Sequence, residues 1–129
     1  MEQSEILKAH VQVKRSYALL AEVLDVSKQL AEALDRDDQV TLRMLVAMRG
    51  EPINKLRLTQ AVLEEQKMGL STEDSGRLTE LLNGAPANEE AEEAIATQVQ
   101  MNQRLLQQVL ELDKVLSLKL AREKSFYNK

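Results

Sequence analysis

Apolar residues recur at seven-residue intervals over residues 2–34, and this spacing constrains the fold more than any other feature of the sequence. Seven residues make about two turns of an α-helix, so side chains at this interval share one face. The pattern predicts a single amphipathic helix over residues 2–34. The face comprises Ile6, Val13, Leu20 and Leu34, beside His10, Tyr17, Leu24 and Ala31, with Ala9, Val23 and Leu30 completing the stripe. At about 1.5 Å per residue such a helix would be roughly 45 Å long, and it would need equally long neighbours to bury its stripe.

The composition supports a fold made only of helices. Hydrophobic residues are 43% and charged residues 29% of the chain, which is enough apolar material to build a core. Aromatic residues are only 2%, so the core must consist of Leu, Val, Ile, Ala and Met, which suit helix packing. A chain of 129 residues makes one domain. We therefore expect a single all-α domain over residues 1–129, an elongated antiparallel bundle of three long helices with a short extra helix in the linker.

A second long helix is expected over residues 38–66, after a short acidic turn at residues 35–38. The acidic side chains of this turn suit the positive end of the following helix. Gly50 and Pro52 interrupt the helix, and a proline inside a helix costs roughly 3 kcal/mol unless the helix bends. We predict a kink between Met48 and Pro52, with a complete break as the alternative. The side of this helix assigned to the core comprises Leu42, Leu45, Val46, Arg49, Ile53, Leu56 and Leu63.

The helical pattern lapses over residues 67–87, where glycine, serine and proline accumulate. This segment is the main linker. Within it residues 77–82 favour a short helix, with Ser71 or Thr72 as its N-terminal cap and residues 83–84 as its end. Such a helix would pack over one end of the bundle.

The last long helix, expected over residues 88–126, carries two apolar faces. Asn88 would cap it, and the glutamates that follow would lie in solvent near its positive end. Those glutamates are Glu89, Glu90, Glu92 and Glu93. The face assigned to the core comprises Ala91, Ile95, Asn102, Leu105, Val109, Leu112, Leu116 and Leu120. A thinner arc, rotated away from it, comprises Leu106, Leu110, Leu118 and Ala121. Three helices would not cover both faces, and leftover apolar surface indicates a partner-binding site.

Patterns typical of catalytic and metal-binding proteins are absent from the sequence. There is no cysteine, and the only histidine, His10, lies on the apolar grid of the first helix, where a packed position is expected. No phosphate-binding loop, nucleophile elbow or zinc-ligand spacing occurs. We therefore expect no enzyme activity, no catalytic residue, no cofactor and no metal.

Charge and hydropathy also limit the partners. The formal net charge is -4 and the basic residues are scattered, which disfavours nucleic acid as a partner. No apolar run approaches the roughly 20 residues that span a bilayer, and the N-terminus lacks the pattern of an export signal. The lack of cysteine suits the cytosol. We expect a cytoplasmic protein that does not insert into membranes.

One enzymatic hypothesis competes with this interpretation, because all-helical chorismate mutases hold an anionic substrate between helices with arginines and lysines. The basic residues that faintly resemble such a site are Arg43, Arg49, Lys55 and Arg57. The first helix adds only Lys14 and Arg15 near its apolar face, and the last helix only Gln107 or Gln108. In the simpler interpretation Arg49 lays its methylenes along the core and keeps its guanidinium in solvent.

Residues 101–112, with the sequence MNQRLLQQVLEL, resemble the C-terminal helix of the FlgN-type flagellar export chaperones. In that family an Asn, a basic residue, paired leucines, a Gln and a later Leu recur in much this order. The layout of a long first helix, a helical hairpin and a long last helix is similar over nearly the whole chain, and the motif covers about residues 99–120. The resemblance implies a cytoplasmic chaperone that binds the helical C-terminal tail of hook-filament junction proteins and delivers them for type III export. The chain lacks the Tyr-Gly tail frequent in the family.

The same resemblance implies where a partner binds, since the family binds its substrates on the late helix. The matching positions are Asn102, Leu105, Leu106, Val109 and Leu110. Leu118 is added because it belongs to the leftover apolar arc. A partner helix would place apolar anchors against such a surface. The competing structural hypothesis is a homodimeric coiled-coil scaffold, in which the same stripe pairs with a second copy and there is no client.

Overall fold

The computed structural model describes residues 1–127, with side chains described through Arg122, and it consists of helices joined by short loops. The elements in chain order are α1 (Gln3–Asp35), α2 (Gln39–Met68), α3 (Thr72–Leu82), the single 3-10 turn η1 (Glu90–Glu92) and α4 (Glu93–Tyr127). No strand occurs in residues 1–127, so the predicted all-α class is confirmed. The final two positions of the predicted domain, 128 and 129, lie outside the described residues.

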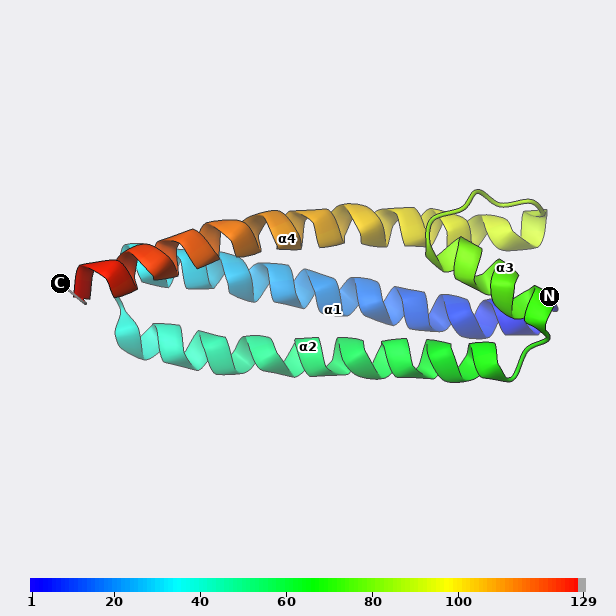
Figure 1. Ribbon diagram of the computed structural model, residues 1–129, viewed down its shortest axis with the longest axis horizontal. Coiled ribbons are helices and arrows are strands. Elements are labelled where there is room, and N and C mark those ends of the chain that lie inside the picture. Colours follow the sequence, from blue (N-terminus) through cyan, green and yellow to red (C-terminus); the bar gives the residue numbers. More distant parts are fainter. Residues whose placement is uncertain (128–129) are drawn as a thin grey trace.

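The three long helices lie side by side, with α1 between the other two (Figure 1). α2 runs antiparallel to α1, whereas α4 runs in the same direction as α1 (Figure 1). Both α2 and α4 pack along α1, but they barely contact each other. One side of α1 is therefore left open between α2 and α4.

Local capping residues determine where the helices begin. The side chain of Asp38 accepts a hydrogen bond from the Thr41 amide at 3.1 Å, and Ser71 accepts one from the Asp74 amide at 3.2 Å. Each satisfies a backbone donor that has no partner inside the helix. The observed ends fall within one or two residues of the predicted ones for α1 and α2. α3 is capped by Ser71, one of the two predicted caps, and begins at Thr72, five residues before the predicted segment 77–82. It ends as predicted beside Gly84, whose φ of 100° favours glycine.

α2 continues through Gly50 and Pro52 as one helix, so the alternative of a complete break is wrong (Figure 1). The bend that we expect there stays a prediction. The side chains of α2 that are buried against its neighbours are Leu45, Pro52 and Thr59, at intervals of seven. Pro52 and Thr59 were not assigned to the core from the sequence, because neither residue type stands out in an apolar pattern.

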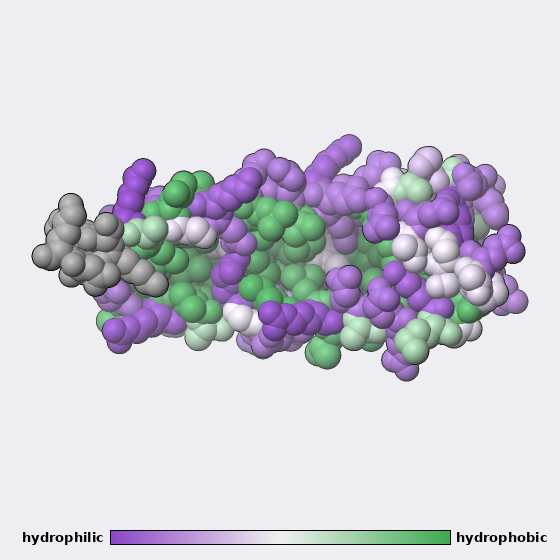
Figure 2. Space-filling view, in the orientation of Figure 1, coloured by the Kyte–Doolittle hydropathy of each residue, from purple (hydrophilic) through white to green (hydrophobic). Residues whose placement is uncertain are grey.

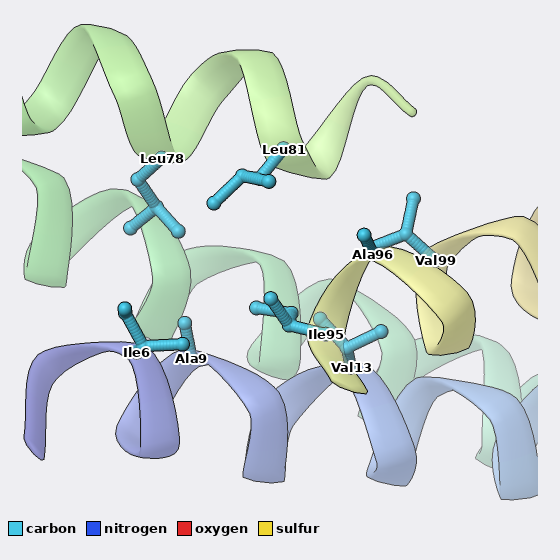
Figure 3. Packing of buried hydrophobic residues seen from close by; sticks show 8 residues of the cluster. All are labelled: Ile6, Ala9, Val13, Leu78, Leu81, Ile95, Ala96 and Val99. Atoms are coloured by element: carbon cyan, nitrogen blue, oxygen red, sulfur yellow. The ribbon is translucent and has the colours of Figure 1, made fainter. Parts of the chain in front are cut away.

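Buried apolar side chains form one cluster near each end of α1. At the N-terminal end of α1, α3 lies across the space between α2 and α4. Its Leu78 and Leu81 are fully buried (Figure 3). This first cluster comprises Ile6, Ala9, Val13, Leu78, Leu81, Ile95, Ala96 and Val99. The second cluster, at the other end, comprises Leu30, Ala33, Leu45 and Leu116. The sequence therefore correctly predicts that the short helix packs over one end of the bundle.

The core face of the last helix differs from the predicted one at its edges. Ile95, Leu105, Val109 and Leu116 are buried as expected. Ala91 is exposed and Leu120 is 41% exposed, so their assignment to the core is wrong. Ala96 and Val99 are buried instead, because α3 covers the neighbouring side of α4 in this region.

Polar contacts join the helices between the two apolar clusters. The hydroxyl groups of Ser16 on α1 and Thr59 on α2 lie 3.1 Å apart. The side-chain amide of Asn102 on α4 donates to the backbone carbonyl of Val13 on α1 at 2.8 Å. Such bonds have fixed partners, so they set the register of α2 and α4 along α1.

Glu92 contradicts the expectation that the acidic residues at the start of the last helix lie in solvent. It is only 3% exposed, and its carboxylate accepts hydrogen bonds from the Arg77 guanidinium at 2.6 and 2.9 Å. Asn88 also differs from its predicted capping role, because its backbone amide donates to Glu92 at 2.9 Å. Arg77, opposed by burial, lowers the pKa of the Glu92 carboxyl to about 2. The ion pair fastens α3 to the start of α4.

Candidate helix-docking groove

The open side of α1 forms the floor of a groove whose walls are α2 and α4. Its far end, near the C-terminal ends of α1 and α4, is a depression of about 420 Å³. Leu30 and Leu34 of α1 form the floor there. The apolar wall residues are Leu42, Val46 and Ile53 on α2, and Leu116 and Leu120 on α4.

The near end of the groove is a second depression, of about 260 Å³, next to α3. Val13 and Leu20 of α1 line its floor, and Leu106 belongs to its α4 wall. Leu82 and Asn83, at the C-terminal end of α3, also line this depression. The groove therefore starts where α3 ends.

α3 shows what kind of element fits between α2 and α4. It contacts both helices and buries Leu78 and Leu81 completely against the floor and the start of α4 (Figure 3). Leucines three residues apart lie on one face of a helix. The chain thus fills one end of the space between α2 and α4 with its own amphipathic helix and leaves the rest uncovered.

The two depressions share no lining residue, and together they are long enough for a helix of several turns. They extend along α1 from Val13 to Leu34 and along α4 from Val99 to Leu120. At 1.5 Å per residue this corresponds to about 30 Å, or a helix of about 20 residues. Figure 2 shows apolar side chains in separate patches along the middle of this face, with hydrophilic side chains that border the patches and also cross between them.

The predicted partner-binding residues on α4 divide into buried and accessible groups. Leu105 and Val109 are 8% and 5% exposed and belong to the core, so a partner would not reach them without opening the molecule. Asn102 is half-buried, with its amide bonded to Val13 and its oxygen accepting from Gln98 at 3.0 Å. Leu106, at 42% exposure, lines the groove.

Leu110 and Leu118 are 48% and 62% exposed, as expected for the leftover apolar arc. They line a shallow depression on the outer face of α4 together with Asp113 and Ser117. Asp113 and Ser117 also line the far end of the groove. The exposed arc of α4 and the groove therefore form one continuous surface, to which Leu106, Leu110 and Leu118 all contribute.

The α2 wall was not predicted as binding surface. Val46 and Ile53 were assigned to the core, yet Val46 is 58% exposed and both line the groove. They lie seven residues apart and on a different side of α2 from the buried Leu45 and Pro52. The apolar residues of α2 extend around more of the helix than contact with one neighbour would bury. This width could have indicated a binding surface, as the second apolar face did on the last helix.

An ion pair spans the groove at Arg49. The Arg49 guanidinium of α2 pairs with Asp113 of α4 and donates to the buried Ser27 hydroxyl of α1 at 2.9 Å. The expectation that this guanidinium lies in solvent is therefore wrong. Lys55 pairs with Glu51 at 3.7 Å on the exposed surface of α2. The Arg49 contact ties α2, α1 and α4 together beside the far depression.

The single histidine of the sequence, His10, has a shifted pKa. It is half-buried, and burial with the nearby Lys14 lowers its pKa. Among residues 1–122, whose side chains are described, no three His, Asp or Glu side chains come close enough to hold a metal ion. Within residues 1–127 none of the helices combines enough length and apolar character to cross a membrane.

Comparisons with known proteins add nothing to this description, since no protein-family model, curated protein or solved structure matches the chain. The fold and the groove define the described part of the chain as all-helical, with an uncovered apolar surface between α2 and α4. Function must be argued from this surface.

Proposed function

We propose that this protein is a cytoplasmic chaperone that binds a helical segment of another protein in the groove between α2 and α4. The open, apolar groove is the observation that carries this proposal. Following the resemblance of residues 101–112 to FlgN-type chaperones, the client is the helical C-terminal tail of a hook-filament junction protein, held for type III export. No cofactor, nucleic acid or membrane takes part.

The groove supplies the physical basis of binding. A client helix places apolar anchors at i, i+3, i+4 and i+7 into such a surface. Burial of apolar area contributes about 25 cal/mol per Å², and ordering of the client tail offsets much of this. The expected result is moderate affinity, which suits a chaperone that must release its client. The client helix would cover the side of α1 that lies open between α2 and α4.

The proposal is tested by placing charges in the groove. Leu106→Glu with Leu120→Glu puts two carboxylates on the α4 wall, and a bound apolar helix would have to desolvate both. We expect binding of a synthetic hook-filament junction tail to weaken at least 100-fold, measured by fluorescence anisotropy. The control is Leu7→Glu with Leu58→Glu, two exposed leucines outside the groove that should leave binding unchanged. Equal binding by both variants would place the site elsewhere.

A homodimeric scaffold is the competing hypothesis, because the exposed arc of α4 could equally be covered by a second copy. Sedimentation velocity at several concentrations separates the two. The chaperone proposal requires that the free protein be a monomer, or a dimer that the tail peptide dissociates. A stable dimer that neither binds the tail peptide nor dissociates when the peptide is added would favour the scaffold.

A further inference from the structure

The charges around the groove are unbalanced, although the groove itself is neutral. Arg49 and Asp113 neutralise each other inside the groove, and Lys67 pairs with Glu64 at 3.0 Å near its other end. The floor residues contributed by α1 carry no charge. Any charge preference for a partner must therefore come from the rims.

Two arginines of α2 lie on the groove side of that helix. Arg57 is four residues after Ile53 and seven after Gly50, both of which line the groove. Arg43 is seven residues before Gly50. Residues three, four and seven apart share one face of a helix, so both arginines lie along the α2 rim.

The α4 rim adds Lys114, which lines the outer depression together with Asp113 and Ser117. Arg43, Arg57 and Lys114 are exposed, and none of them pairs with a carboxylate among the residues whose side chains are described. Glu111 lines the same depression as Lys114 and accepts a hydrogen bond from the neutral Gln107 amide at 3.2 Å, so its charge offsets that of Lys114 on the α4 rim.

The α2 rim thus carries unpaired positive charge on a protein whose formal net charge is -4. We infer that the groove selects amphipathic helices of about 20 residues whose apolar stripe is flanked on one side by acidic residues. When the stripe enters the groove, these carboxylates of the partner lie beside Arg43 and Arg57 on the α2 rim. Charge complementarity of this kind sets partner choice and association rate more than affinity. The inference rests on the proposed function, which makes the groove the helix-binding site.

The test uses three synthetic helical peptides of 20 residues, a length taken from the groove. They share one leucine stripe and carry Glu, Gln or Lys at the flanking positions. Exposed ion pairs are individually weak and screened by salt, so the two arginines together should give about a fivefold preference for the Glu peptide over the Lys peptide at low ionic strength. The Gln peptide should bind with intermediate affinity. Fluorescence anisotropy measures the affinity of each peptide at low and at high salt. The preference for the Glu peptide should be present at low salt and lost at high salt.

Arg43→Glu with Arg57→Glu should reverse the preference, so that the Lys peptide binds more tightly than the Glu peptide. Lys14→Glu with Arg15→Glu makes the same change in net charge on exposed positions of α1 that do not line the groove, and it should leave the preference as it is. Equal binding of all three peptides would overturn the charge inference and leave helix docking intact. If no peptide binds, or if the peptides only dissociate a dimer of this chain, the partner assigned to the groove is wrong.

Discussion

The buried carboxylate of Glu92 holds together two segments that are distant in sequence. Its side chain is 4% exposed and pairs with Arg77, which also donates to the Pro86 carbonyl at 3.0 Å. Removing one partner of a buried pair leaves the other charge without compensation. At the scale of single residues, Glu92 is therefore the charged group that most affects the stability of the end where α3 packs.

The pKa of Glu92 predicts how stability changes in acid. Its folded-state pKa of about 2 lies below the ordinary value of 4.5. The ionised group therefore stabilises the fold above pH 4.5, and this contribution, at most about 3 kcal/mol, is lost as the pH falls from 4.5 to 2. Glu92→Gln should unfold at lower urea concentration at pH 7, and the difference from the native chain should shrink at low pH. Glu93→Gln, next to it but exposed, is the control and should change neither.

The burial of Glu92 could not be predicted from the sequence, for a physical reason. A run of glutamates at a helix start fits the helix dipole, and that local argument correctly describes Glu89, Glu90 and Glu93, which are exposed. Glu92 is buried only because α3 brings Arg77 to it, and this contact depends on the path of the whole linker. Local patterns contain no such information.

At the scale of elements, the helix ends were predictable because their signals are local. Ser71 and Gly84 act within a few residues of their own positions, so the ends of α3 follow from the sequence. On α4, buried and exposed side chains were predictable where the spacing of apolar residues along the helix separates the two. The partner-binding residues taken only from the resemblance to FlgN-type chaperones include buried Leu105 and Val109 as well as exposed Leu106 and Leu110.

Leu105 and Leu106 give a direct test of that division, because they are adjacent and identical. Leu105→Ala removes a side chain that is 8% exposed and should lower the free energy of unfolding by about 2–4 kcal/mol. Leu106→Ala, at 42% exposure, should lower it by less than about 1 kcal/mol. Urea denaturation followed by circular dichroism measures both. Equal losses would mean that Leu106 is packed in the core, and that the groove does not reach it.

Pro52 tests the continuity of α2. The ring is buried, but it removes one backbone hydrogen bond from the helix. In Pro52→Ala the restored hydrogen bond and the relaxed helix should outweigh the lost ring contacts, so stability should stay similar or rise by up to about 2 kcal/mol. Chemical denaturation gives the sign. A loss of more than about 1 kcal/mol would instead show that a bend at Pro52 is required for α2 to pack on α1.

At the scale of the whole molecule, the openness between α2 and α4 was not predictable from periodicity. A hydrophobic repeat shows that a helix face will be buried, but it does not show which element buries it. The two apolar faces of α4 indicated more apolar surface than three helices cover. Only the arrangement of α2 and α4 on opposite sides of α1 shows that this surface forms one groove.

The outer arc of α4 provides the last prediction, which concerns how far the binding surface extends beyond the groove. Leu110→Glu with Leu118→Glu changes two leucines that are 48% and 62% exposed, so the free protein should lose less than about 1 kcal/mol of stability. If the partner covers this arc, two carboxylates pressed against its apolar side must be desolvated, and binding of the tail peptide should be lost.

Met101→Glu with Val115→Glu is the matched control on the same helix. Both residues are exposed, at 41% and 43%, and neither lines the groove nor the outer depression. This variant should fold and bind as the native chain does. Thermal melting and peptide anisotropy, measured on both variants, distinguish the outcomes. Unfolding of the Leu110 and Leu118 variant would place these leucines in the core. Normal folding with normal binding would confine the site to the groove itself, where Leu106 and Leu120 are then the exposed α4 leucines that the partner contacts.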